Sequence, residues 1–546
     1  MRDGTVLTAD VYRPVGDGPW PVLVQRTPYG KQTPISNANV LDFYKTLRRG
    51  YIIVNQDTRG RFTSMGKWMP WEYEGDDGYD TIEWAATIDG SNGMVGMFGA
   101  SYTGNTQWAA AVTRPPHLRA IAPQITWSAP EDGIFYRGGA LEFGLNVWWT
   151  LGQSMGQFAK EVAGDDELAS LLANTFDDLD HLADRTYWEL PSAAVPAIAR
   201  TGQPDVGTQR GLIDPSSLRH ARVAGRYSEV SVPSLNVAGW FDVFSQGTID
   251  NHLGTRAAGL ESRLIIGPWE HMSGITVTPG HINGINYGLG SVAPGGDGTM
   301  TGVQLDWFDH YLAGGPKGPS HESAVDYYVM GVDEWRREDH WPPERAEATR
   351  FYLHSDGTLS RTAPTDDRSV SEYDYDPAKP APTSGGSTTI ASSFPAGQVN
   401  QSSVEQRGDV LTFTSAPLTE PLEITGRVTA TIHAATDGPS TDWVVRLCDV
   451  DEDGVSLNIV DGITRVHTTA GHVDGTDVDL WSTSIVLAVG HRLRVQVTSS
   501  NFPRWDRNPN TGEDPKTATQ MRVAHQTVHH DRVRASCIVL PVISSF

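Results

Sequence analysis

The chain has 546 residues, a formal net charge of −24 at pH 7, 38% hydrophobic residues and a mean hydropathy of −0.34. At roughly 100–200 residues per domain, this length predicts two to four domains. The excess of acidic residues, with no compensating block of Lys and Arg, argues against nucleic-acid binding. No apolar run approaches the roughly 18 residues that span a bilayer, so we expect a soluble protein and no membrane partner.

The ends of the chain and its two cysteines bear on location and redox state. Met1 to Thr5 lack the apolar core of a secretory signal and lead directly into a strand pattern, which predicts a cytoplasmic protein. Cys448 and Cys537 lie far apart in apolar, strand-like runs. We therefore expect buried free thiols rather than a disulfide framework or a thiolate metal site.

Strands alternate with helices in the first part of the chain. Short apolar, β-branched runs predict the strands, and segments of helix formers predict the helices. The expected strands cover residues 21–24, 51–54 and 94–99, and the expected helices cover residues 80–86 and 106–112. This alternation is typical of βαβ units.

The strand pattern fades between about residues 128 and 223. Segments 160–172 and 177–190 carry helix formers with apolar spacing, so they predict a helical insertion. The α/β pattern then returns as strands at 234–239 and 263–267 and a helix at 304–312. We therefore expect one α/β sheet that is interrupted by the insertion.

Beyond about residue 349 the chain changes to short alternating runs separated by Gly, Asp and Pro turns. Residues 427–432 and 492–497 are examples, and the pattern predicts an all-β sandwich. Residues 376–393 are rich in Pro, Ser, Gly and Thr, which favours an exposed linker or long loop inside this region.

Ser101 is the candidate nucleophile. It lies in Gly-Ala-Ser-Tyr-Thr-Gly at residues 99–104, between a predicted strand and a predicted helix, where a sharp turn can expose its Oγ. Thr103 stands where the Gly-x-Ser-x-Gly pattern has glycine. The motif alone therefore leaves open that Ser101 only caps the helix.

Two later residues supply the partners that an acyl-transfer serine needs. Asp242 and His271 each follow a predicted strand, in the chain order Ser, Asp, His that α/β-hydrolases use. The carboxyl ends of such strands are where open α/β sheets bind ligands. The order therefore indicates a catalytic triad.

The other histidines are weaker candidates. His252, His281 and His310 do not directly follow a buried strand that ends in a Gly-Pro break, so we expect surface or structural roles for them. Four more lie towards the C-terminus, at His491, His525, His529 and His530. They lack an ordered spacing with carboxylates or cysteines, so no metal site is predicted.

Eight strings of residues along the chain form an ordered set. They are Met1-Arg2-Asp3-Gly4, Pro28-Tyr29-Gly30-Lys31, Gln56-Asp57-Thr58-Arg59-Gly60, Gly99-Ala100-Ser101-Tyr102, Gly239-Trp240-Phe241-Asp242, Gly267-Pro268-Trp269-Glu270-His271, Val329–Trp335 and Ser499–Asn508. Together they resemble the cocaine esterase and Xaa-Pro dipeptidyl-peptidase family of serine hydrolases. The similarity spans nearly the whole chain.

The resemblance implies an α/β fold in three parts. Residues 1–127 and 224–348 would form a discontinuous α/β-hydrolase catalytic domain, and residues 128–223 an inserted helical cap. Residues 349–546 would form a C-terminal jelly-roll β-sandwich. These parts agree with the changes of pattern described above.

The resemblance also implies roles for individual residues. Ser101, His271 and Asp242 would form the triad, and the backbone N–H of Tyr102 and the hydroxyl of Tyr29 would hold the oxyanion. The substrate-binding residues would be Phe135, Trp149 and Phe244. No metal or organic cofactor would be required.

The substrate class follows from charge. The segment after Asp242 offers no carboxylate to pair with a substrate ammonium, which favours an aryl or alkyl ester. Glu131, Asp132 and Glu142 could supply such an anionic site, so a dipeptidyl-peptidase or an acylase that cleaves an amide stays the alternative. A glycan-binding or structural protein is a remote third reading. The expected partner is a small-molecule ester, and a homodimer stays open.

Overall fold

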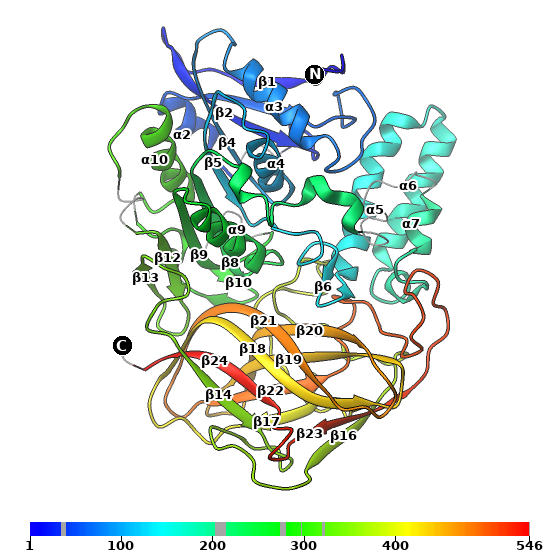
Figure 1. Ribbon diagram of the computed structural model, residues 1–546. Coiled ribbons are helices and arrows are strands. Elements are labelled where there is room, and N and C mark those ends of the chain that lie inside the picture. Colours follow the sequence, from blue (N-terminus) through cyan, green and yellow to red (C-terminus); the bar gives the residue numbers. More distant parts are fainter. Residues whose placement is uncertain (34–39, 202–214, 273–279, 296, 319–322, 545–546) are drawn as a thin grey trace.

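The computed structural model describes residues 1–33, 40–201, 215–272, 280–295, 297–318 and 323–544 (Figure 1). Within these residues, nine strands form one sheet in the order β1-β3-β2-β4-β5-β8-β9-β12-β13. The strands from β3 to β12 in this order run parallel, and the two edge strands are antiparallel to their neighbours. The bounds are β1 Ala9–Tyr12, β2 Trp20–Thr27, β3 Ile52–Asp57, β4 Ser91–Ala100, β5 Leu118–Gln124, β8 Ser234–Phe241, β9 Ser262–Glu270, β12 Val325–Val329 and β13 Glu334–Glu338.

Helices cover both faces of this sheet, which explains why its strands are apolar on both sides. Val22 and Val24 of β2 pack towards one face with α3 and α4, whereas Leu23 packs towards the other with α2 and α10. The bounds are α2 Phe43–Arg48, α3 Glu74–Ala85, α4 Tyr102–Ala111, α9 Ser245–Ala257 and α10 Met300–Leu312. The expected strands and helices of this part all fall on such elements.

The segment between β5 and β8 leaves the sheet and is mainly helical (Figure 1). It contains α5 Phe143–Glu161, α6 Asp165–Asp180 and α7 Pro196–Arg200, with short strands β6 Tyr136–Arg137 and β7 Ala140–Leu141. The expectation of helices at 160–172 and 177–190 was wrong in detail. Val162 adopts an extended conformation that ends α5, so residues 160–172 belong to two helices, and α6 ends at Asp180.

The C-terminal part consists of two antiparallel sheets. Within the described residues, one sheet contains β14, β15, β16, β18, β21, β23 and β24, and the other contains β17, β19, β20 and β22. The bounds are β14 Glu347–Leu353, β15 Leu359–Ser360, β16 Val370–Tyr375, β17 Leu411–Thr414, β18 Leu422–Thr436, β19 Ser440–Val450, β20 Ser456–His467, β21 Asp474–Leu487, β22 Arg492–Thr498, β23 Ala524–His529 and β24 Cys537–Ile543. An α/β-hydrolase fold with a C-terminal all-β domain is thereby confirmed.

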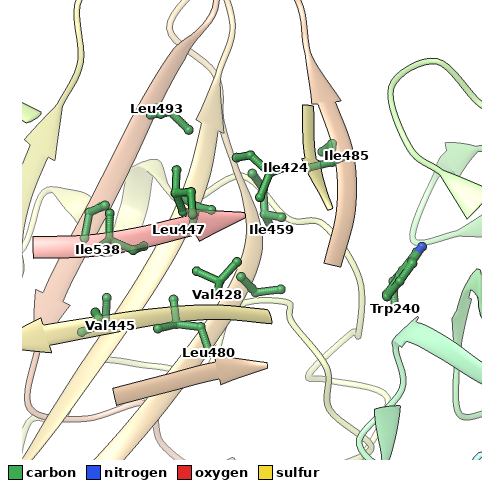
Figure 2. Close-up of a cluster of buried hydrophobic side chains, with 14 of the residues drawn as sticks. Trp240, Ile424, Val428, Val445, Leu447, Ile459, Leu480, Ile485, Leu493 and Ile538 are labelled. Carbon is green, nitrogen blue, oxygen red and sulfur yellow. The ribbon is translucent and has the colours of Figure 1, made fainter. Parts of the chain in front are cut away.

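One apolar core joins the two parts. Figure 2 shows buried side chains such as Leu447, Val445 and Ile538 gathered between the strands of the sandwich, with Trp240 of β8 at one side of the same cluster. The indole N–H of Trp240 donates to the carbonyl of Tyr328 at 2.8 Å. The sandwich therefore shares its core with the sheet that ends at the site described below.

Polar contacts tie the sandwich to α9 and β8 as well. The hydroxyl of Ser482 in β21 donates to the side-chain carbonyl of Gln246 in α9 at 2.9 Å. The hydroxyl of Ser387 donates to the carbonyl of Trp240 at 3.1 Å. Ser387 belongs to residues 376–393, and the expectation that this segment is exposed was wrong, because most of its residues from 380 to 390 are buried.

Two further observations concern membrane and redox chemistry. Among the described residues, no helix has the length and apolar character needed to cross a membrane. Cys448 and Cys537 are both free and buried, as the sequence predicts. Burial raises the pKa of the Cys448 thiol to about 12, so this group stays protonated.

Candidate active site

Ser101 occupies a strained turn between β4 and α4. Its φ of 59° lies in the left-handed region, which serine adopts only where surrounding structure enforces it. The Ser101 N–H donates to the carbonyl of Gln124 at 3.0 Å, and the Ser101 carbonyl accepts from the hydroxyl of Thr126 at 2.9 Å. These contacts fix the turn against β5 and present Oγ at the carboxyl edge of the sheet.

The departure from the Gly-x-Ser-x-Gly pattern has a local explanation. The Thr103 hydroxyl accepts from the N–H of Ala100 at 2.7 Å and donates to the Ala100 carbonyl at 2.8 Å, so it closes the turn. The two positions of this turn that have no room for a side chain are both glycines. A Cβ on Gly99 would lie 2.4 Å from Thr103 Oγ1, and one on Gly104 would lie 2.9 Å from the carbonyl of Gln124.

His271 and Asp242 complete a continuous chain of hydrogen bonds with Ser101. Nε2 of His271 lies 2.9 Å from Ser101 Oγ, and Nδ1 lies 2.6 Å from Asp242 Oδ2. The carboxylate of Asp242 is fully buried and also accepts from the N–H of Phe244 at 2.7 Å. Since Asp242 only accepts, Nδ1 carries the proton and Nε2 faces Ser101 as a base.

The position of the three side chains follows from the topology. Ser101 follows β4, Asp242 follows β8 and His271 follows β9, all at the carboxyl ends of parallel strands of one sheet. Burial of the imidazole lowers the pKa of His271, but the adjacent Asp242 carboxylate raises it, and the net effect is a raised pKa. Phe244 packs edge-on against the imidazole at 5.2 Å.

Two hydrogen-bond donors belong to residues that line the cavity beside Ser101. Tyr102 is the first residue of α4, so its N–H has no partner within the helix and lies at the positive end of the helix dipole. The hydroxyl of Tyr29 lies in the same cavity and accepts from the indole N–H of Trp149 at 3.3 Å. Burial raises the pKa of Tyr29, so the phenol keeps its proton and can donate it.

The side chain of Tyr102 has a separate, structural role. Its hydroxyl donates to Glu74 at 2.8 Å and accepts from the N–H of Trp71 at 3.0 Å. Glu74 is paired with Arg26 at 2.7 Å in the same buried network. The side chain thus anchors the first turn of α4.

A cavity of about 350 Å³ opens beside Ser101, and its lining is mainly apolar and rich in aromatic side chains. Its aromatic lining consists of Tyr29, Trp71, Tyr102, Trp127, Trp148, Trp149 and Phe244. Two of the expected pocket residues, Trp149 and Phe244, therefore line it. Phe135 does not, because it lies fully buried behind Trp71, with the two rings edge-on at 5.4 Å.

The three carboxylates that the sequence offers for binding a substrate ammonium group lie outside this cavity. Glu131 pairs with Arg222, and Glu142 accepts from the indole N–H of Trp505 at 2.9 Å. Asp132 lines a different cavity beside Arg137, where burial raises the pKa of its carboxyl to about 6. The lining carboxylate that sequence reasoning missed is Glu270, the residue before His271.

The remaining histidines have local partners or exposed positions. His252 is fully buried beside the hydroxyl of Ser262 at 3.0 Å, and burial lowers its pKa to about 3. His491 and His525 each lie 2.8 Å from an aspartate, and His530 lies 3.0 Å from a serine hydroxyl. Among the described residues, no group of three or more His, Cys, Asp or Glu side chains could hold a metal ion.

Family models match two long stretches of the chain. Residues 3–273 match the family described as X-Pro dipeptidyl-peptidase (S15 family). Residues 318–539 match the X-Pro dipeptidyl-peptidase C-terminal non-catalytic domain. Cocaine esterase from Rhodococcus sp. (strain MB1 Bresler) is 34% identical over 100% of this chain and 97% of its own.

Two solved structures are similar over the whole length. An aminopeptidase from the marine sediment archaeon Thaumarchaeota archaeon has a TM-score of 0.84 at 26% identity and covers 100% of this chain and 95% of its own. An α-amino acid ester hydrolase has a TM-score of 0.80 at 26% identity and covers 99% of this chain and 95% of its own. Both the α/β part and the sandwich are thus common to these proteins.

Replacement of Gly99 by alanine tests the turn at Ser101. The backbone at Gly99 has a φ of 143°, and the added Cβ would collide with Thr103, so Gly99→Ala should lower the melting temperature and esterase activity. The control is Gly152→Ala in α5, where nothing lies within 4 Å of the added atom. Equal melting temperatures and activities of the two variants would contradict this account of the turn.

Proposed function

We propose that this chain, which belongs to the cocaine esterase and X-Pro dipeptidyl-peptidase (S15) family and is a serine ester hydrolase, cleaves carboxylic esters with Ser101 as nucleophile. The observation that carries this proposal is the unbroken hydrogen-bond chain from Ser101 through His271 to Asp242. Ser101, at one end of these hydrogen bonds, lies beside an aromatic-rich cavity that is large enough for a small ester.

The first half of the reaction forms an acyl-enzyme. Nε2 of His271 takes the proton of Ser101 as Oγ attacks the ester carbonyl, while Asp242 holds the imidazole in the required tautomer. The N–H of Tyr102 and the hydroxyl of Tyr29 stabilise the negative charge on the carbonyl oxygen. The imidazolium then gives its proton to the leaving alcohol, and the C–O bond breaks.

The second half returns the free enzyme. His271 takes a proton from water, which attacks the acyl carbonyl, and the same two donors hold the second oxyanion. The proton passes to Ser101 Oγ as the carboxylic acid leaves. In this mechanism the chain's own side chains perform each proton transfer, so we propose no metal or organic cofactor.

The lining of the cavity supports an uncharged acyl group. Trp149 and Phe244 offer apolar surface to an aryl or alkyl chain, and none of Glu131, Asp132 and Glu142 reaches the cavity. A small-molecule ester is therefore the proposed partner. The cytoplasmic location stays a prediction from the sequence, and a homodimer stays open.

Hydrolysis of an amide with a free α-amine is the second candidate. The observation that favours it is Glu270, whose carboxylate lines the cavity and could pair with an ammonium group. Its Oε2 already accepts from the N–H of Met272 at 2.7 Å, which fixes it beside His271. An aminopeptidase and an α-amino acid ester hydrolase are among the similar structures, and both names refer to substrates derived from amino acids.

Replacement of Ser101 by alanine tests the nucleophile and the reaction class together. The wild type should hydrolyse p-nitrophenyl butyrate and turn over Ala-Pro-p-nitroanilide far more slowly, because the cavity favours an uncharged acyl group. Ser101→Ala should lower ester turnover by at least about 10³-fold, since no covalent intermediate can form. Full activity of the variant, or preference for the anilide, would reject the esterase assignment.

Removal of the Tyr29 hydroxyl tests the oxyanion donor. Tyr29→Phe should lower kcat by about 10²–10³-fold, as loss of one donor does elsewhere, with little change in KM or melting temperature. Tyr51→Phe is the matched control, because the Tyr51 hydroxyl is also hydrogen-bonded, to Asp309 at 2.7 Å, but lies outside the cavity. An unchanged kcat in Tyr29→Phe would remove Tyr29 from the mechanism.

The pH profile tests the contact between His271 and Asp242. The base works only when neutral, so kcat/KM should fall as the pH drops through the raised pKa of His271. Asp242→Asn removes the charge that raises this pKa, so the acid limb should move to lower pH while kcat falls by about 10⁴-fold. The readout is p-nitrophenol release at its isosbestic wavelength. An acid limb that does not move would contradict the assignment.

A further inference from the structure

The Tyr29 hydroxyl has two polar neighbours, one on the inserted helix α5 and one at the nucleophile. The indole N–H of Trp149 in α5 donates to this hydroxyl at 3.3 Å. Burial raises the pKa of Tyr29, whereas hydrogen bonds with Trp149 and with Ser101 lower it. All three residues line the cavity. The phenol oxygen therefore connects the inserted segment to the residue that attacks the substrate.

The hydrogen bond from Trp149 limits where the proton of Tyr29 can point. An indole N–H only donates, so the Tyr29 oxygen is the acceptor, and the single phenolic proton is left for another partner. Ser101 is the neighbour on that side, and an oxyanion forms next to Ser101 Oγ when it attacks a carbonyl. A hydroxyl that accepts one hydrogen bond is also a stronger donor in the next.

Aromatic neighbours hold the indole of Trp149 in this orientation. Its ring stacks on Trp71 at 5.8 Å and 25°, and on Tyr102 at 6.4 Å and 15°. Trp68 packs against it at 6.0 Å with a tilt of 53°. Such contacts leave the ring little freedom to turn. The N–H that reaches Tyr29 is therefore fixed before a substrate binds.

Arg61 joins the same two segments at a second point. Its Nε donates to the carbonyl of Pro28, the residue before Tyr29, at 2.7 Å. Its Nη1 and Nη2 donate to the carbonyl and the side-chain oxygen of Gln153 at 3.2 and 3.0 Å. Gln153 lies about one helical turn after Trp149 in α5. Because Arg61 is buried, these bonds set the spacing between Tyr29 and Trp149.

We propose that Trp149 is a positioning residue for the oxyanion donor, because its indole N–H directs the proton of Tyr29 towards the carbonyl oxygen of the substrate. This inference rests on the ester hydrolysis and on the role of Tyr29 proposed above. It gives Trp149 a second role besides that of a pocket wall. The inserted helix α5 then takes part in the catalytic geometry, so kcat depends on it and not KM alone.

A double-mutant cycle between Trp149 and Tyr29 tests the inference. Trp149→Phe keeps an aromatic ring and removes the N–H, so kcat for p-nitrophenyl butyrate should fall about tenfold, a typical effect of one hydrogen bond to a charged group. In the Tyr29→Phe background no hydroxyl is left to direct, so the same change should alter kcat by less than about twofold. The smaller ring changes the pocket in both backgrounds, and the comparison cancels that effect.

Two further variants separate the N–H from the shape of the ring. Introduction of benzothienylalanine at position 149 alone replaces the N–H by sulfur and keeps the two fused rings, so kcat should again fall about tenfold with KM and melting temperature unchanged. Trp188→Phe is the matched control in the inserted segment. The Trp188 N–H also donates, to the carbonyl of Ala183 at 2.7 Å, but Trp188 lies outside the cavity. Its kcat should stay within about twofold of the wild type.

The outcomes separate this inference from the proposal beneath it. A fall in kcat that depends on the Tyr29 hydroxyl supports the positioning role. An equal fall in both backgrounds, a change confined to KM, or an equal effect of Trp188→Phe overturns that role and leaves the esterase assignment intact. If Tyr29→Phe itself leaves kcat unchanged, the roles of Tyr29 and Trp149 are both overturned. A wild type that does not hydrolyse the ester overturns the esterase assignment as well.

Discussion

The left-handed backbone at Ser101 is the constraint on which the rest of the site depends. A serine with a φ of 59° carries strain of about 1–3 kcal/mol, which must be offset by its surroundings. The carbonyl of Gln124 and the hydroxyl of Thr126 supply hydrogen bonds on one side. Every residue of α4 is buried, so the helix on the other side has no room to relax. The strain therefore persists, and it aims Oγ at His271.

This constraint also accounts for the network beneath the site. The Tyr102 side chain, which follows the strained residue, is fastened to Glu74 and through it to Arg26. The backbone N–H of the same residue is thereby held at the start of α4, and Tyr102 lines the cavity. One residue thus serves the fold through its side chain and, in the proposed mechanism, serves the chemistry through its backbone. A donor that is fixed before the reaction needs no reorganisation during it.

The sequence predicted the parts of the molecule that depend on regular patterns. Runs of apolar residues located the strands of the sheet, and the chain order of Ser101, Asp242 and His271 indicated residues that the topology brings within hydrogen-bond distance. The break at Val162 was missed although Gly164, a residue type that often ends helices, follows it and stands at the N-cap of α6. They also misjudged residues 376–393, whose Pro, Ser, Gly and Thr content is typical of exposed loops, although tertiary contacts bury the segment.

The one misplaced pocket residue, Phe135, has the same origin. Phe135 is apolar and lies in the inserted segment, but whether an aromatic ring faces a cavity or lies one layer behind depends on packing against Trp71, which sequence order does not encode. Glu270 and Thr389 were missed for a related reason. Glu270 stands inside the string that ends at His271, where the histidine drew the attention, and Thr389 is almost 290 positions from Ser101, which lines the same cavity (389 − 101 = 288).

The shared apolar core has a consequence for how the chain loses its structure. Trp240 lies in the same buried cluster as the interior of the sandwich. Ser482 also donates a hydrogen bond to Gln246 at the start of α9, and Ser387 donates one to the carbonyl of Trp240 near the end of β8. Unfolding of either part would expose the apolar partner of the other, so the two free energies of unfolding are coupled. We therefore regard the chain as one cooperative unit. A change to the substrate pocket that is made in the α/β part also alters the stability of the sandwich, and a change made in the sandwich alters the stability of the α/β part.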